Sequence, residues 1–184
     1  LNVVDLLVDD DLTVTGDVAV TGDYSSATSG TSNLRLGVNA GNSIASGGNY
    51  NVVLGDEAGT AITTGDYNVA IGFEALKTED AGGFNTAVGY QALKTQDAGD
   101  AGNVAVGYQA GLDITTGFSN TLVGASAGAN ITDGDYNTFM GSNVGISVTT
   151  GLQNTLIGSL AGDALTDADF NVAVGYGALS TDTL

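Results

Sequence analysis

The stretch NVAIGFEALKTEDAGGFNTAVGYQAL, residues 68–93, contains two copies of a unit in which an Asn is followed four residues later by a Gly. An aliphatic residue or Met stands just before that Gly. The unit occurs nine times in the 184-residue chain, and its asparagines are Asn33, Asn51, Asn68, Asn85, Asn103, Asn120, Asn137, Asn154 and Asn171. They are 17 residues apart, except for two steps of 18. This short, sustained period predicts a solenoid in which each repeat is one coil of backbone.

Each repeat is expected to begin with a short strand directly after its Asn. From the second repeat onward, the residues two and three positions after the Asn are both apolar, for example Ala70 and Ile71. We interpret the third position as facing the interior of the coil. A strand with two apolar faces needs cover on both sides, and one coil has a single interior. We therefore expect the second position to pack against a neighbouring protomer.

A trade between two later positions indicates a close-packed interior. Where the eighth residue after the Asn is Gly, as at Gly59, the eleventh is aliphatic, as at Ile62. Where the eighth is Leu, the eleventh is polar, and these pairs are Leu76 with Glu79, Leu93 with Gln96, and Leu179 with Asp182. Because packed interiors disfavour both voids and excess volume, the two positions are predicted to compete for one pocket.

The repeated Asn and Gly have distinct predicted roles. The asparagines are expected to stack as a ladder, with side-chain amides bonding between adjacent coils about 4.8 Å apart. The Gly four residues after each Asn, Gly37 in the first repeat and Gly175 in the last, is expected to turn the chain out of the strand with a positive φ. A second Gly, such as Gly65, is expected to open the return loop.

The first part of the chain has a different period. Asp5, Asp11, Asp17 and Asp23 recur every six residues, with valines between them. We predict a short β-prism-like stem over residues 1–24, a joint over 25–32, and a nine-coil solenoid over 33–184 that belongs to a longer chain. A prism of this size is too small to hold a core by itself, so the stem is expected to be stable only when wound with other chains.

Composition excludes several classes of function. Three cations stand against 21 acids, for a net charge of -18, and such a surface repels phosphate backbones and anionic headgroups. We therefore expect no nucleic-acid partner, and no stretch approaches the ~20 apolar residues of a membrane span. The chain has no His and no Cys, which excludes a Ser-His-Asp triad, a Cys nucleophile and the usual zinc sites. No cofactor is expected.

These motifs resemble two related groups of proteins. The unit from Asn85 to Leu93, NTAVGYQAL, is similar to repeats of bacteriophage tail fibres. The NVAIG core from Asn68 to Gly72 resembles the head domains of trimeric autotransporter adhesins of the YadA kind. The resemblance covers about residues 33 to 184 and implies a homotrimer of left-handed parallel β-rolls, displayed outside a virion or cell. Adhesin heads of that kind use shorter coils, so the period and the lead favour the fibre group.

A few side chains are candidates for a site. Phe73, Tyr90 and Tyr108 share one coil position, and Gln91 and Gln109 stand beside two of them. Sugar faces pack on aromatic rings while amides bond hydroxyls, so these five residues are candidate glycan contacts. The alternative is that the rings shield the coil edge or fill an interface between protomers, since aromatics mostly serve packing.

Three acidic or hydroxyl patterns have simpler explanations than a functional site. Glu57 and Glu74 occupy the same place in consecutive coils, about 5 Å apart, near the separation of the carboxylates in retaining glycosidases. We interpret them instead as an exposed acidic column. Asp9–Asp11 offers oxygen ligands to Ca²⁺ but lacks a Gly-spaced calcium loop, and solvated charge is favoured. A Thr column that includes Thr115 lacks the paired rows of an ice-binding face, and Asp80 interrupts it.

The sequence therefore predicts an all-β structural protein without enzymatic activity. We expect a trimeric parallel β-roll segment of a phage tail fibre, which serves outside the cell as a rigid shaft or spacer for recognition of a host surface. The alternatives are a bacterial trimeric adhesin or extracellular filament and, from another class, a glycan-degrading fibre enzyme. A monomeric solenoid covered by other proteins also fits the two-faced strands.

Overall fold

The computed structural model describes residues 29–180, and these form a single β-solenoid. Its nine strands each have three residues: β1 Leu34–Leu36, β2 Val52–Leu54, β3 Val69–Ile71, β4 Thr86–Val88, β5 Val104–Val106, β6 Thr121–Val123, β7 Thr138–Met140, β8 Thr155–Ile157 and β9 Val172–Val174. The predicted stem and the first half of the predicted joint lie outside the described residues. Within that range there is no helix long and apolar enough to cross a membrane.

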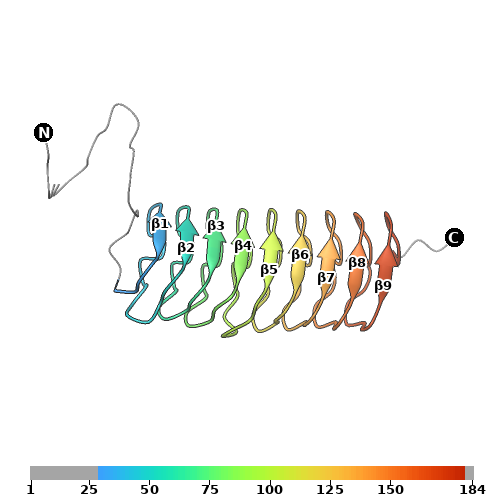
Figure 1. Cartoon of the computed structure of the whole chain (residues 1–184). Coiled ribbons are helices and arrows are strands. Elements are labelled where there is room, and N and C mark those ends of the chain that lie inside the picture. Colours follow the sequence, from blue (N-terminus) through green and yellow to red (C-terminus); the bar gives the residue numbers. More distant parts are fainter. Residues whose placement is uncertain (1–28, 181–184) are drawn as a thin grey trace, which may run out of the picture.

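The strands stack in chain order into one parallel sheet, as the row of arrows in Figure 1 shows. Each strand pairs with the next in the same register, so that Val69 lies beside Thr86 and Ala70 beside Ala87. We number the coils 1 to 9, each running from one repeat Asn to the residue before the next. Coils 1 and 4 have 18 residues, and coils 2, 3 and 5 to 8 have 17. The predicted solenoid and its period are confirmed.

The predicted facing of the strand residues was wrong. The middle residue of each strand, two positions after the Asn, points into the coil, and from Val53 to Leu156 this column is fully buried. The third position faces outward, with Leu36 52%, Met140 47% and Val174 68% exposed. When the second and third residues of a short strand are both apolar, either of them can face the interior. In this protein the interior takes the second residue, whose volume fits the coil. The third position still leaves an uncovered apolar column along the strands, whereas the first position is Thr in four of them.

The predicted competition for one pocket is confirmed by the packing. A Cβ added at Gly59 would lie 2.8 Å from Ile62 Cδ1, and one at Gly128 would lie 2.6 Å from Ile131 Cδ1. Leu76 and Leu93 instead fill this volume themselves and are fully buried. Because real Cβ contacts are longer than these distances, a Leu at the eighth position and an aliphatic residue at the eleventh exclude each other.

The asparagine ladder is confirmed and proves to be double. From Asn51 to Asn171, each repeat Asn donates its backbone N–H to the side-chain Oδ1 of the preceding repeat Asn, at 2.8–3.0 Å. In coils 1 to 3 and 5 to 8 the Asn Nδ2 also donates to a carbonyl in the return loop of its own coil, at 2.7–2.9 Å. An Asp could not make the second bond, because its carboxylate has no donor.

The Gly that ends each strand has the predicted positive φ, between 127° and 143°. It also permits a close approach between coils, since a Cβ at Gly55 would lie 2.7 Å from the carbonyl oxygen of Gly72 in the next coil. Both requirements explain why no other residue occupies this column.

Candidate functional site

The three candidate rings lie together on the surface, two residues beyond the ends of β3, β4 and β5. Phe73 and Tyr90 have ring centroids 5.5 Å apart, and Tyr90 and Tyr108 have centroids 5.3 Å apart. The ring planes are nearly parallel, at 16° and 7°, and all three side chains are about half exposed. Residues in equivalent positions of stacked coils are one coil apart, and this spacing produces the ring stack.

The two candidate amides are also aligned, but they bond mainly to each other. Gln109 Nε2 donates to Gln91 Oε1 at 2.9 Å, and Gln91 Nε2 donates to Glu74 Oε2 at 2.7 Å. These residues all have a left-handed backbone, with φ of 52° to 55°, which directs the chain out of the turn. The hydrogen-bonded row leaves the amides fewer free groups for a sugar than their sequence positions suggest.

The stacking limits what the ring column can bind. Both faces of Tyr90 are turned toward neighbouring rings, so a sugar ring has no free face to pack on at this residue. Phe73 and Tyr108 end the stack and each have a ring on one side only, because the preceding coil has Asp56 at this position and the next coil has Ala125. Tyr108 is the more exposed of the two, at 53% against 42%. Of the candidate contacts, Tyr108 therefore offers the most accessible aromatic face for a glycan.

The acidic pair Glu57 and Glu74 is joined by lysines. Lys77 Nζ lies 2.7 Å from Glu74 Oε1 and 3.4 Å from Glu57 Oε2, and Lys94 Nζ lies 2.7 Å from Glu74 Oε2. Hydrogen bonds from Lys77, Lys94 and Gln91 lower the pKa of Glu74 to about 2. A general acid needs a raised pKa, so this arrangement suits a structural ion-pair cluster rather than a glycosidase pair. The pair of Lys77 with Glu74 could have been predicted from the sequence, since Lys77 follows Glu74 by three residues.

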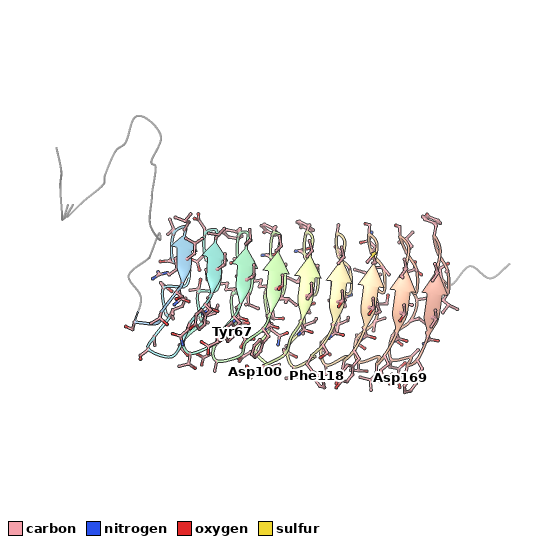
Figure 2. The ribbon with its side chains drawn as sticks, in the orientation of Figure 1. Tyr67, Asp100, Phe118 and Asp169 are labelled. Carbon is pink, nitrogen blue, oxygen red and sulfur yellow. The ribbon has the colours of Figure 1, made fainter. Side chains whose placement is uncertain are left out.

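A second ring column, which sequence reasoning missed, lies at the other end of the strands. Tyr50 and Tyr67 have centroids 5.0 Å apart and planes at 8°, and Tyr67 and Phe84 have centroids 5.4 Å apart and planes at 11°. Each ring directly precedes a repeat Asn, and this position could have been read from the sequence. Figure 2 places Tyr67 near the start of the strands, with Phe118 at the same side of the rod.

The Thr column forms no separate site. The Thr column is part of the rod's framework, because the backbone N–H of Thr115 donates to the carbonyl of Thr132, and Thr132 donates likewise to Thr149. Asp9–Asp11 lies outside the described residues. Among residues 29–180, no group of three or more His, Cys, Asp or Glu side chains is placed to hold a metal ion.

Comparison of the chain with protein-family models, curated proteins and solved structures finds no match to any of them.

Proposed function

We propose that this chain is a rigid structural segment of an extracellular fibre, in which three copies pack together through their outward strand faces. One observation carries the proposal: the third strand position leaves a partly exposed apolar strip along all nine strands. Val106 and Met140 on this strip are 37% and 47% exposed. Contiguous exposed apolar surface of this kind marks an interaction site in soluble proteins.

The ladders explain why the segment suits a mechanical role. Each coil is bonded to the next through the strand backbone and the buried asparagines, and a continuous core runs through the coils. Such bonding resists bending at most places along the rod, because a local bend has to break several rungs together. Three parallel copies would repeat any surface group three times and increase avidity for a repetitive target.

A shaft or spacer of a phage tail fibre is the favoured reading, because the 17-residue period and the lead resemble that group. A bacterial trimeric adhesin or filament is the nearest alternative. Weak glycan contact is compatible with either role and is supported by the free face of Tyr108. The ion pairs of Glu74 give no support to glycan hydrolysis.

The test is the solution mass of the chain by light scattering. A trimer has three times the 18.2 kDa of one chain. Met140→Glu places a charge on the outward strand face and is expected to lower the mass towards that of a monomer. Thr150→Glu, at an exposed position of the same coil, is the matched control and is expected to leave the mass unchanged.

A folded wild-type monomer would contradict the proposed packing. So would a trimer that tolerates Met140→Glu as well as it tolerates the control, because that result would place the contact elsewhere on the rod.

A further inference from the structure

One carboxyl group is buried inside the coils. Glu79 occupies the position that is aliphatic in coils with Gly, next to the fully buried Leu76, and its own side chain is also fully buried. Its Oε1 accepts the backbone N–H of Gly82 at 2.7 Å, and its Oε2 lies 3.3 Å from Asn85 Nδ2. The two lysines of this region pair with Glu74 at the surface, so no cation neutralises Glu79.

The Glu79 carboxyl accepts a hydrogen bond from an Asn side chain that in other coils bonds to the return loop. In coils 1 to 3 and 5 to 8 the repeat Asn ties down the return loop of its own coil, whereas Asn85 donates to Glu79 of the preceding coil. Backbone rungs join Thr63 to Asp80 and Asp97 to Thr115, but none joins Asp80 to Asp97 among the described residues.

The return loop of coil 4 is open on its side toward coil 5, whereas toward coil 3 the carbonyl of Gly99 lies directly against Gly82. Gly99 and Gly102 have positive φ values of 69° and 60°, and a Cβ added at either would meet no atom within 4 Å. At Gly117, in the next coil, the added Cβ would lie 2.5 Å from the carbonyl oxygen of Gly134. Figure 2 shows Asp100, which lies between the two open glycines, at the edge of the rod.

The next coil provides a neutral counterpart. Gln96 occupies the same position as Glu79 and is also fully buried. Its Oε1 accepts from Asn103 Nδ2 at 2.6 Å, and Asn103 Nδ2 also donates to the loop carbonyl of Gly117 at 2.7 Å. An uncharged amide at this position is therefore compatible with a tethered return loop.

We propose that coils 3 and 4 form a proton-sensitive joint in the rod, in which loss of the Glu79 proton diverts Asn85 from the return loop of coil 4 and loosens that loop. This inference goes beyond the proposed structural role and holds for a monomer as for a trimer.

The direction of the response follows from the titration. Burial raises the pKa of Glu79 to about 7, and the nearby carboxylates of Asp97 and Asp80 add to the shift, while backbone hydrogen bonds from Gly82 and Asp80 oppose it. A group whose pKa is raised on folding stabilises the closed joint fully below the unfolded value, which is 4.5 here. That stabilisation is lost as the pH rises from 4.5 through about 7. The joint is therefore expected to be firm in mild acid and loose in mild alkali.

Hydrogen exchange of the full chain, measured by mass spectrometry and corrected for the intrinsic exchange rate at each pH, tests the joint. From the two pKa values, 4.5 and about 7, protection of residues 79–102 is expected to fall about 30-fold between about pH 5.5 and 8.5. Glu79→Gln is expected to remove this fall, as Gln96 predicts. Asp113→Asn removes an exposed carboxyl and is expected to behave like the wild type. Coils 6 to 8 are expected to show no such fall in any of the proteins.

An equal fall in wild type and Glu79→Gln, or a fall spread evenly over all coils, would overturn the proposal. Should Glu79→Gln fail to fold, carbon-13 NMR of the carboxyl groups in the wild type decides. Titration of Glu79 near pH 7 together with a local loss of protection supports the joint, whereas titration in the ordinary range near 4.5 refutes it.

Discussion

The pocket shared by the eighth and eleventh positions of a coil can be tested by converting one kind of coil into the other. Gly59→Leu alone places a large side chain where an added Cβ would already lie 2.8 Å from Ile62 Cδ1 and 3.2 Å from Val53 Cγ1. Overpacking of a core costs about 1–3 kcal/mol, and a non-Gly residue in the left-handed region costs about 1–2 kcal/mol more. We expect the single change to destabilise the protein by about 2–5 kcal/mol.

Two further changes should remove the excess volume. Adding Ile62→Gln and Val53→Ala gives coil 2 the same three residues that coil 4 has at these positions, Ala87, Leu93 and Gln96. The backbone accepts the Leu, because φ is 50° at Gly59 and 49° at Leu93. The triple variant keeps the backbone strain and gains a buried amide, but it loses the overlap. We expect it to be more stable than Gly59→Leu alone by at least about 1 kcal/mol.

The assay is chemical denaturation of the wild type, the three single variants and the triple variant, followed by circular dichroism. Hydrogen exchange of the Val52 amide, which donates to the carbonyl of Asn68, reports on coil 2 itself. Since the three positions touch, their effects should be strongly non-additive, with the triple variant losing about 3 kcal/mol less than the sum of the singles. Additive effects would refute the shared pocket and with it the explanation of the Gly and Leu coils.

Three other perturbations have definite expected outcomes. Asn137→Asp removes the donor that bonds Gly151 and Asn120, and it buries a charge. It should therefore lower the free energy of unfolding, measured by denaturation, by about 3 kcal/mol or more. The exposed Asn143→Asp should cost little, and similar losses in the two variants would contradict the role of the ladder. Because the pKa of Glu74 is lowered, its ion pairs stabilise the protein above pH 4.5 and lose their effect as the pH falls towards 2. Glu74→Gln should therefore reduce the change in unfolding free energy over that pH range by about 1 kcal/mol or less. High salt should do the same to the wild type. Saturation-transfer NMR with a panel of methyl hexopyranosides should detect contact that Tyr108→Ala abolishes and Tyr90→Ala leaves largely intact; loss of contact in both variants alike would place the binding elsewhere.

Much of the fold could be predicted because each position of the coil is seen in nine repeats, and a residue type that recurs there indicates its structural role. The Asn ladder, the positive φ of Gly37 and its equivalents, and the competition between Gly59 and Ile62 each follow from one residue type recurring at one place. The burial of the strand positions did not follow, because period-two alternation over three residues has two solutions when both columns are apolar. A partial signal was present: the middle position is Ala in coils 3 and 4, where Leu fills the pocket, although coil 5 also has Ala there together with Gly111.

The candidate site was only partly predictable from the sequence. Equal positions in successive coils correctly placed Phe73, Tyr90 and Tyr108 in one stack. The spacing could not show that the rings cover one another, or that Gln91 and Gln109 would bond to each other. It also could not show that Glu79 lies inside, since a polar residue in an amphipathic pattern ordinarily faces water. Glu79 is buried beside Leu76 and Ala70, and only the packed coil reveals this.

The contacts between successive coils are alike along the rod, and this has a consequence for how the repeat number can change in evolution. Each coil offers the next one the same Asn oxygen and the same close Gly contact that it receives from the one before. In coils 2 and 8 the side chains nearest to the pocket belong to the coil itself, although in coil 5 Leu93 and Leu122 of the neighbouring coils also fill it. An in-frame duplication or deletion of one coil's coding segment should therefore change the length of the rod by one step and leave the remaining bonds intact. Unequal recombination between the repeats would then give descendants with rods of different lengths and little change in chemistry.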